Sequence, residues 1–389
     1  MKVNIDAQCL CQPLQKRRGI QISISTLLQA CVRRGKLRYS ACFFDKFRER
    51  NNREFVSAYL YDLIDSIELI ENNYFSYKDI SVVSDERRTV KRKPYSSYTD
   101  LDADVFYFPT INFPIDLDIN RSVVTIHDAF AYTNSRYISQ YPERCKRNRE
   151  SIEYLKKRND VWITVPSKAV KNDLINVVGI GDDRIFVVPW AADKAYFYSE
   201  KNNSILTEVG ISKPYILYLG SLQEHKGVKT LVDAFEQLNN KDFQLVICGV
   251  YTTQEVTEVA GNNKKKNDIL FPGFVTDEQK RGLLSKAELF VFPSYYEGFG
   301  LPILEAMACG TPVICTDVSS LPEVGGTAVK YFKAGDTEAL AELMMELIDD
   351  EVQRDKMRKD GIIQCNNFSW DKTAAMMEKV FEDRYCLAT

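Results

Sequence analysis

Histidine is scarce in this sequence, since two of its 389 residues are His, at positions 127 and 225. This leaves few imidazoles for acid–base catalysis. The ten cysteines contain no CxxC pair and no metal-ligand spacing, and several lie in apolar runs, so we expect reduced thiols that mostly pack in the interior. No stretch approaches the roughly 20 apolar residues that span a bilayer. The N-terminal MKVNIDAQCL lacks a basic segment followed by a long apolar one, as a secretory signal requires. These absences predict a cytoplasmic protein.

The length of the chain and its charge distribution indicate two unlike halves. A chain of 389 residues exceeds one ordinary core and predicts about two domains. Residues 1–190 carry 30 Lys and Arg against 24 Asp and Glu, whereas the remainder carries 21 against 30. Basic clusters at 33–35, 87–93 and 156–158 suit contact with anionic lipid at the inner face of the membrane, or with an anionic acceptor. Solvated helix faces are the simpler explanation for any one cluster, and no nucleic-acid partner is expected.

Strand-like runs alternate with helix-like segments along the chain, which favours parallel sheets built from βαβ units. Strands are predicted at 3–7, 39–44, 104–110, 122–128, 161–167 and 185–191, and then at 215–221, 243–249, 268–273, 288–294 and 312–317. Between the strands of the second group, apolar residues recur at helical spacing, as in KTLVDAFEQL, DEQKRGLLSKA and LPILEAMACG. The polar region 46–100 is expected to form variable helices or excursions at the edge of the sheet.

The predicted fold is therefore α/β, with two Rossmann-like doubly wound domains. We place the N-terminal domain at 1–190 and the C-terminal domain at 205–368. The segment 189–204, with its Pro, Asn and Ser, breaks the pattern and is the predicted linker. A closing helix at about 369–389 is expected to pack back on the first domain.

The segment YYEGFGLPILEAMACG, residues 295–310, has the composition of an anion-binding turn. Gly298 and Gly300 let the backbone approach a ligand, and Pro302 suits the first turn of a helix. A strand, a tight turn and a helix N-terminus put free N–H groups, near 299–301, at the carboxyl end of a strand. The segment predicts a phosphate site on backbone grounds.

Two carboxylates stand in this segment, at Glu297 and Glu305, and a diphosphate would repel them. Hydroxyl groups are suitable partners instead. Glu297 can accept from sugar hydroxyls and Glu305 from ribose hydroxyls, so a nucleotide sugar would satisfy the whole segment. A helix cap with two solvated glutamates is the alternative reading of the same residues.

The segment EGFGLPILEAMACGTPVICTD resembles the E-x7-E donor-site signature of retaining glycosyltransferases of family 4, in which Glu297 and Glu305 match the two glutamates. The family has the GT-B fold, two Rossmann-like domains facing each other across a cleft. SSLPEV at 319–324 resembles the bacterial mannosyltransferase branch of surface-polysaccharide synthesis. The resemblance implies transfer of a hexose, mannose favoured, with retained anomeric configuration.

A second constellation lies in YLGSLQEHKGVKTLVDAF, residues 218–235. Lys226 is predicted at a helix N-terminus beside the anion site, where its ammonium can neutralise the departing diphosphate. Relatives usually carry Arg-Lys in this turn, so His225 replaces the arginine with a weaker cation. Ser221 stands where some branches have an arginine just after the glycine. A plain surface lysine is the alternative for Lys226.

Two weaker motifs come from the first half of the chain. His127, in SVVTIHDAF, follows a buried-looking strand and resembles the histidine of the family's T-x-H-D segment, which faces the donor sugar. A structural histidine is the alternative. KRRGIQIS at 16–23 resembles a degenerate form of the family's glycine-rich first loop, in which Gly19 is retained. An ordinary strand-to-helix turn explains that loop equally well.

These observations predict an enzyme that uses a nucleotide-sugar donor, GDP-sugar favoured over UDP-sugar, and a saccharide or lipid-linked saccharide acceptor. The predicted catalytic residues are His127, Lys226 and Glu297. The predicted donor-binding residues are Gly19, Ser221, His225, Lys226, Gly298, Phe299, Gly300, Leu301 and Glu305. No cofactor or metal is expected, because the aspartate pairs 102/104 and 116/118 read as turn or capping residues. A non-catalytic partner subunit and a nucleotide-sugar epimerase or hydrolase of the same fold remain the alternatives.

Overall fold

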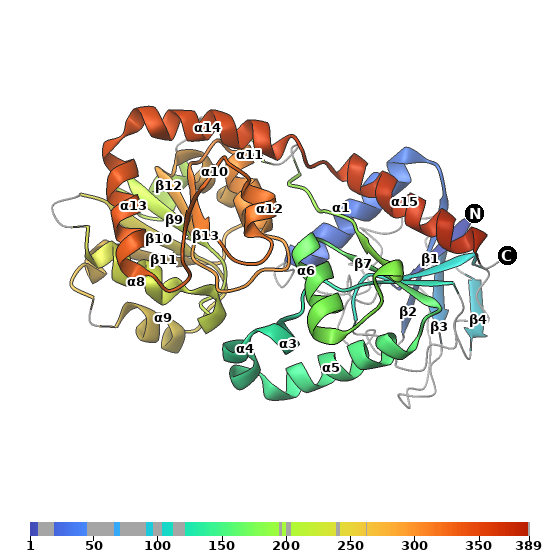
Figure 1. The fold of residues 1–389 in the computed structure, drawn as a ribbon. Helices are drawn as coiled ribbons and strands as arrows, with labels where there is room; N and C mark the ends of the chain where they lie inside the picture. The colour runs from blue at the N-terminus through green and yellow to red at the C-terminus, as the bar shows by residue number, and fades with distance from the viewer. Residues whose placement is uncertain are drawn as a thin grey trace.

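The computed structural model describes the chain except for residues 7–18, 45–65, 71–90, 96–102, 112–120, 194–196, 200–203, 239–241, 262 and 388–389. The described residues form two parallel sheets, each covered by helices, that lie side by side (Figure 1). The predicted α/β class with two doubly wound domains is confirmed.

The first sheet has the strand order β4-β3-β2-β1-β5-β6-β7-β8, and each neighbouring pair runs parallel. Its strands are β1 (Lys2–Asp6), β2 (Arg38–Phe44), β3 (Ser66–Ile70), β4 (Lys91–Tyr95), β5 (Val105–Phe108), β6 (Ser122–Thr125), β7 (Val161–Val165) and β8 (Ile185–Val187). The strand order reverses direction between β1 and β5, which is a topological switch point.

The second sheet has the order β11-β10-β9-β12-β13-β14 and is also parallel. Its strands are β9 (Tyr215–Leu219), β10 (Gln244–Cys248), β11 (Ile269–Gly273), β12 (Leu289–Phe292), β13 (Val313–Thr316) and β14 (Lys330–Phe332). Here the switch point lies between β9 and β12. The loops that follow these two neighbouring strands therefore emerge together, where open α/β sheets bind ligands.

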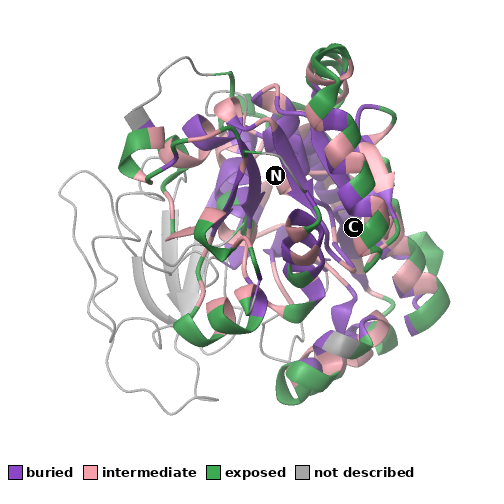
Figure 2. Ribbon diagram, turned by 90° about the vertical axis from the view of Figure 1, so that its left-hand side faces the viewer, coloured by how far each residue is buried: buried purple, intermediate pink, exposed green. Residues whose placement is uncertain are grey.

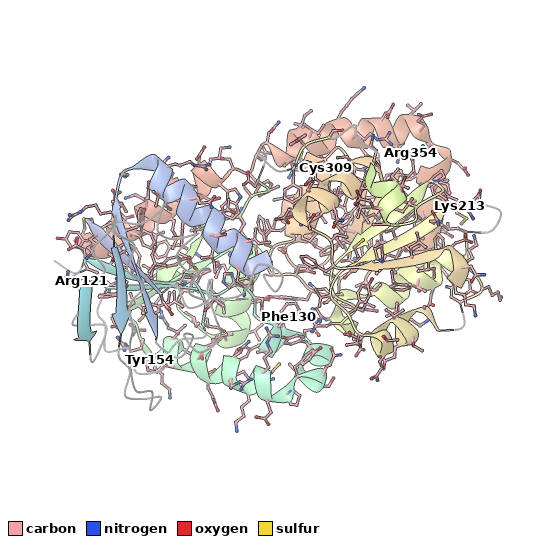
Figure 3. The ribbon with its side chains drawn as sticks, turned by 180° about the vertical axis from the view of Figure 1, so that it is seen from behind. Arg121, Phe130, Tyr154, Lys213, Cys309 and Arg354 are labelled. Atoms are coloured by element: carbon pink, nitrogen blue, oxygen red, sulfur yellow. The ribbon has the colours of Figure 1, made fainter. Side chains whose placement is uncertain are left out.

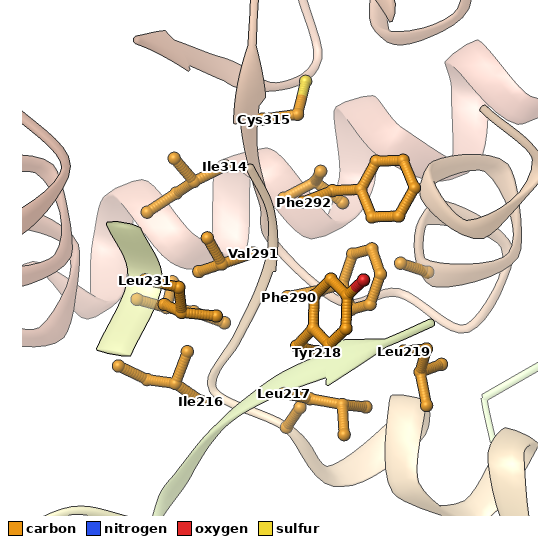
Figure 4. Packing of buried hydrophobic residues seen from close by; sticks show 14 of the residues in the cluster. Ile216, Leu217, Tyr218, Leu219, Leu231, Phe290, Val291, Phe292, Ile314 and Cys315 are labelled. Carbon is orange, nitrogen blue, oxygen red and sulfur yellow. The ribbon is translucent and has the colours of Figure 1, made fainter. Parts of the chain in front are cut away.

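The strands of the second sheet read as continuous apolar runs because helices cover both faces of the sheet. All five residues of β9 and all four of β12 are buried. Phe290 and Phe292 point to one face, with their ring centroids 6.0 Å apart, and Val291 points to the other (Figure 4). Figure 2 shows the same division across the molecule, with buried residues in the strands and exposed ones on the outer helix surfaces.

Helices connect the strands in both domains. In the first domain they are α1 (Gly19–Arg34), α3 (Phe130–Thr133), α4 (Ser135–Gln140), α5 (Pro142–Lys157), α6 (Lys168–Asp173) and the short turns 174–178 and 182–184. In the second they are α7 (Ser204–Glu208), the 3-10 turn 224–226, α8 (Val228–Glu236), α9 (Thr253–Ala260), the turn 266–268, α10 (Asp277–Lys286), α11 (Leu301–Ala308), α12 (Leu321–Gly325), α13 (Thr337–Asp349) and α14 (Glu351–Cys365). No described helix is long and apolar enough to cross a membrane.

The last helix, α15 (Trp370–Cys386), leaves the second domain and lies along α1 of the first (Figure 1). Its Met377 and Phe381 are buried in the core cluster of the first sheet. Arg34 donates to the fully buried Glu378 at 2.8 Å. The basic cluster at 33–35 thus holds this helix in place, and the charge of Arg34 is already matched by a carboxylate.

The structure adds elements that the sequence did not predict. β3 and β4 lie at the edge of the first sheet, within the region 46–100 that was expected to form helices or excursions at that edge. β14 extends the second sheet by one strand. Of the cysteines whose side chains are described, all but Cys386 are buried.

Candidate active site

The centre of the candidate site is an ion pair between the two loops that follow β9 and β12. Lys226 Nζ lies 2.7 Å from Oε1 of Glu297, and both side chains are largely buried. Ser294 donates its hydroxyl to the same carboxylate oxygen at 2.6 Å. The second carboxylate oxygen of Glu297 takes no part in these contacts. The predicted catalytic lysine and glutamate are therefore brought together.

Serine side chains hold the backbone of the glutamate loop. Glu297 N–H donates to Ser319 Oγ at 2.8 Å, and Ser320 Oγ donates to the carbonyls of Glu297 and Phe299 at 2.9 and 2.8 Å. Gly300 then takes a φ of 104°, which favours glycine, and is the N-terminal cap of α11. The first turn of α11, beginning at Leu301, has no side-chain cap. Pro302 has no N–H, and the N–H of Ile303 donates to the carbonyl of Gly300 at 3.1 Å.

The lysine loop is equally constrained. Gly227 has a φ of 66°, and a Cβ atom on it would lie 2.0 Å from the carbonyl oxygen of Pro293. Only glycine lets the turn at 224–226 lie against the strand end of β12 in this way. Tyr295 N–H donates to the carbonyl of His225 at 2.8 Å and fastens the two loops together.

Glu305, the second glutamate of the signature, is buried in α11 and pairs with Lys280 of α10. Burial raises the pKa of the Glu305 carboxyl, while the charge of Lys280 opposes that shift. The Lys280 ammonium also lies 4.9 Å from the ring centroid of Phe197. Lys280 is a residue that the sequence reasoning missed, although it stands in the predicted helix DEQKRGLLSKA.

His127 follows β6 and lies at the edge of the first sheet that faces the second domain. Its Nε2 lies 2.6 Å from the carbonyl of Pro109, which can only accept, so Nε2 carries the proton. Nδ1 is then an acceptor, and it is buried without a hydrogen-bond partner among the described residues. Burial lowers the pKa of His127 to about 4, so the ring is neutral at pH 7. An unpaired acceptor of this kind is suited to a ligand hydroxyl.

His225 differs from the expectation that it would act as a cation. Its side chain is 3 % exposed and its ring lies 4.9 Å from that of Phe130 and 5.1 Å from that of Tyr137. Burial in this aromatic cluster, with Lys226 nearby, lowers the pKa of His225 to about 3. The imidazole is therefore neutral at pH 7 and packs between the domains. Figure 3 shows Phe130 of this cluster at the junction of the two domains.

The two domains meet through the residues next to the signature. A Cβ atom on Gly298 would lie 2.0 Å from the carbonyl oxygen of His127, so the backbones of the two domains touch there. Ser167 donates to the carbonyl of Gly298 at 2.8 Å. Glu323 accepts from the N–H groups of Lys168 and Ala169, at 2.9 and 2.7 Å, at the start of α6.

Tyrosines add to this contact. Tyr296 donates its hydroxyl to Asp173 at 2.5 Å and accepts from the N–H of Ala129 at 3.3 Å. Gln223 donates to the hydroxyl of Tyr141 at 2.8 Å. These contacts could not be predicted from the sequence, because their partners lie in distant and unrelated segments.

The remaining predicted residues take varied positions. Ser221 is partly buried beside Gln223, Phe299 is buried with its ring 6.1 Å from that of Trp190, and Gly19 is the exposed first residue of α1. The side chain of Asp104 accepts from the N–H of Lys2 at 2.8 Å. Asp102 and the pair 116/118 lie outside the described residues. Within the described part of the chain, no group of three or more His, Cys, Asp and Glu is placed to hold a metal ion.

Known families and proteins resemble this chain over much of its length. The family described as glycosyl transferases group 1 matches residues 206–364. The O-antigen chain mannosyltransferase B of Escherichia coli is 28% identical over 268 residues, which cover 67% of this chain and 70% of that protein. The serotype-specific mannosyltransferase WbdA of Escherichia coli is 25% identical over 277 residues, covering 68% of this chain but 34% of that protein.

Solved structures support the fold. The Anabaena protein Alr3699/HepE, in complex with UDP and glucose, superposes with a TM-score of 0.71 at 16% sequence identity, covering 98% of this chain and 100% of that one. The match to the family spans both loops of the Lys226–Glu297 pair. Residues 206–364 are thus similar to the group 1 glycosyl transferases, and the two sheets form the GT-B fold.

Proposed function

We propose that the chain is a retaining hexosyltransferase that moves a hexose, mannose favoured, from a nucleotide diphosphate sugar to a saccharide or lipid-linked saccharide acceptor. The observation that carries this proposal is the Lys226–Glu297 pair at the carboxyl ends of the neighbouring strands β9 and β12. It combines a cation for phosphate with a carboxylate for sugar hydroxyls. The names of the mannosyltransferase relatives favour mannose, and with it a GDP-sugar over a UDP-sugar.

The chemistry follows from where charge develops. The bond between the anomeric carbon and the diphosphate oxygen breaks, and the acceptor oxygen bonds to the same face of that carbon. The acceptor proton passes to the departing diphosphate. Lys226 and the N–H groups at the start of α11, near Leu301, stabilise the growing negative charge more in the transition state than in the ground state. No covalent nucleophile is needed for this route.

The other site residues position the donor. Glu297 has a carboxylate oxygen free of the contacts to Lys226 and Ser294, and it can accept from a sugar hydroxyl. The buried Nδ1 of His127 can accept from another. The carboxylate of Glu305 accepts hydrogen bonds from the ribose hydroxyls and stays paired with Lys280. The protein supplies orientation, which is worth several orders of magnitude in rate.

A lipid-linked acceptor would bring the protein to the inner face of the membrane as a cytoplasmic, peripheral protein. The charge excess of the first domain supports this, and the basic sequence cluster at 87–93 is the first segment to test. Neutralising the lysines and arginines of 87–93 should then reduce partitioning onto anionic vesicles. Unchanged partitioning would count against a role for that cluster.

A non-catalytic partner subunit is the second candidate, and a specific observation favours it. His225 is neutral and buried where the resemblance leads one to expect an arginine. A partner subunit would not need to neutralise a leaving diphosphate. Turnover of a donor by the purified chain alone would exclude this candidate.

The test is a panel of GDP, UDP and their common sugars, in thermal-shift and nucleotide-release assays, first with EDTA and then with Mg²⁺ or Mn²⁺. Stabilisation by one nucleotide, with slow release from one of its sugars in EDTA, is the expected result. A requirement for metal would contradict the metal-independent part of the proposal. No response to any member of the panel would shift the assignment to the partner subunit.

A further inference from the structure

The second domain offers little unpaired positive charge beside the predicted diphosphate position. Lys226 is already paired with Glu297 at 2.7 Å, and Lys280 with Glu305. His225, next to Lys226 in the same turn, is neutral and buried. A diphosphate leaving group is a multiply charged anion, so these described residues leave it incompletely neutralised.

A strongly basic helix of the first domain begins beside this turn. α5, PERCKRNRESIEYLKK, follows α4 directly, and α4 lies against the turn 224–226. Gln223 donates to the hydroxyl of Tyr141, the residue before α5, at 2.8 Å. The ring of Tyr137 in α4 meets the ring of His225 edge to face at 5.1 Å. In Figure 1, α4 reaches under the second domain.

Arg144 is the basic residue in the first turn of α5. It is exposed, and its guanidinium carbon lies 5.9 Å from the ring centroid of Tyr137. Among the described residues, no carboxylate lies within ion-pair distance of it. The guanidinium therefore rests on the same aromatic ring that packs against His225, and its charge is unmatched.

The effects of the Arg144 charge on neighbouring groups also indicate that it lies near the domain interface. The positive charges of both Arg144 and Lys226 oppose the rise in pKa that burial causes at Asp128. Arg144 and Lys226 also both contribute to the lowered pKa of His225. The two cations, one from each domain, thus act on the same two groups and approach the interface from opposite sides.

We propose that Arg144 of the first domain is a second cation for the diphosphate of the donor, supplied across the interface when the two domains meet. This inference rests on the proposed function and names a residue that binds the diphosphate of the donor. The guanidinium can move from the face of Tyr137 onto phosphate oxygens, which it matches with two parallel N–H groups. Because Arg144 belongs to the other domain, it can stabilise the leaving group only while the two domains are in contact.

The competing explanation is a solvated arginine on a basic helix, and the helix itself provides the control. Lys146 is equally exposed and stands two positions further, so it points about 200° away around the helix. If the charge of α5 acts on an anion only in general, substitution of either residue would weaken binding. If Arg144 contacts the anion specifically, only its substitution would do so.

The experiment compares Arg144→Gln, Arg144→Lys and Lys146→Gln with the wild type. Calorimetry measures the affinity for GDP and UDP and for the corresponding monophosphates, and steady-state assays measure donor turnover. For Arg144→Gln we expect the affinity for the preferred diphosphate to fall about 10- to 100-fold, as for loss of hydrogen bonds to a charged group. The affinity for the monophosphate should change less than about threefold, and Arg144→Lys should recover part of the loss.

The outcomes separate this inference from the proposed function. Wild-type protein that binds and turns over a donor, with Arg144→Gln equal to Lys146→Gln, would overturn the role of Arg144 and leave the proposed function intact. Wild-type protein that binds none of the nucleotides would overturn both. Equal losses for diphosphate and monophosphate would also overturn the assignment, because Arg144 would then act elsewhere than on the second phosphate.

Discussion

The ammonium of Lys226 and the carboxylate of Glu297, 71 residues apart in the chain, lie 2.7 Å from each other. The pair joins the loops after β9 and β12, at the switch point of the second sheet. Each side chain fixes the other, and under the proposed function they do so where the diphosphate and the sugar of the donor meet. Binding of a donor must therefore redistribute the charge of Lys226 between the glutamate and the phosphate.

The first prediction concerns Glu297→Gln, which keeps the size of the side chain but removes its charge. Lys226 would lose its partner and bind the diphosphate product at least as tightly as before. Transfer would fall about 100- to 1000-fold, the usual cost of removing one electrostatic contact made in the transition state. Steady-state turnover and the Kd of the nucleoside diphosphate measure the two effects.

Glu338→Gln is the matched control, since Glu338 is an exposed acid in the first turn of α13 and takes no part in the ion pair. It should leave both quantities unchanged. Equal turnover in Glu297→Gln and in Glu338→Gln would contradict the role of Glu297.

The second prediction concerns Gly298→Ala. The new Cβ atom would lie 2.0 Å from the carbonyl oxygen of His127, and a backbone atom cannot move aside as a flexible side chain can. The domains would be held apart while each remains folded. We expect kcat/KM to fall about 100-fold, the cost of misplacing reacting groups by roughly 1 Å, with little change in the affinity for the nucleoside monophosphate.

Small-angle scattering of the nucleotide-bound protein would detect the separation in Gly298→Ala. Gly35→Asn, in the turn after α1, is the control, because no atom lies within 4 Å of the added Cβ position and asparagine tolerates positive φ. Wild-type activity in Gly298→Ala would mean that the contact with His127 is not needed for transfer.

The third prediction concerns Glu323→Ala. The carboxylate of Glu323 accepts hydrogen bonds from the N–H groups of Lys168 and Ala169 across the interface, as a capping residue does at a helix N-terminus. Such contacts contribute about 0.5–2 kcal/mol. We expect kcat/KM to fall by up to about tenfold while the Kd of the nucleoside monophosphate stays the same. A fall in monophosphate affinity of the same size would place Glu323 in the donor site instead.

The fourth prediction uses the two histidines as probes of pH-dependent stability. Below about pH 6.5 the unfolded chain protonates them. The folded chain resists protonation down to about pH 4 at His127 and about pH 3 at His225, because both are buried. The unfolded state then binds more protons, so the histidines destabilise the fold as the pH falls from 6.5 towards 4.

The raised pKa values of Asp128, Asp173 and Glu305 act in the opposite direction in part of this range. Comparison with His225→Phe removes their effect, because they are common to both proteins. The midpoint of urea unfolding should fall more steeply between pH 7 and pH 5 in the wild type than in His225→Phe. Equal slopes would show that His225 is protonated in the folded protein.

The fold could be predicted from sequence where burial leaves a simple pattern. The strands β9, β10, β12 and β13 were predicted to within two residues, because a parallel strand covered on both faces is a continuous apolar run. The outer strand β4 and its neighbour β3 were not identified, since their residues, such as KRKPY, lack such a run. The three-residue strand β14 is too short to have a pattern of its own.

The site was predictable where its residues share one local motif. Glu297 and Glu305 are separated by seven intervening residues in a strand–turn–helix segment, and Lys226 follows a second strand that pairs with the first. The partners of these residues could not be predicted, because Lys280 and Ser319 meet them only through tertiary packing. The neutral state of His225 depends in the same way on aromatic rings contributed by the first domain.

The most direct test of the account is transfer of labelled mannose from GDP-mannose to a mannose-containing oligosaccharide by the purified protein in EDTA, with the anomeric configuration of the product read by NMR. We expect a product that retains the α configuration of the donor and a loss of transfer of at least 100-fold in Glu297→Gln. An inverted product, or equal transfer by wild type and Glu297→Gln, would contradict the central role given to the Lys226–Glu297 pair.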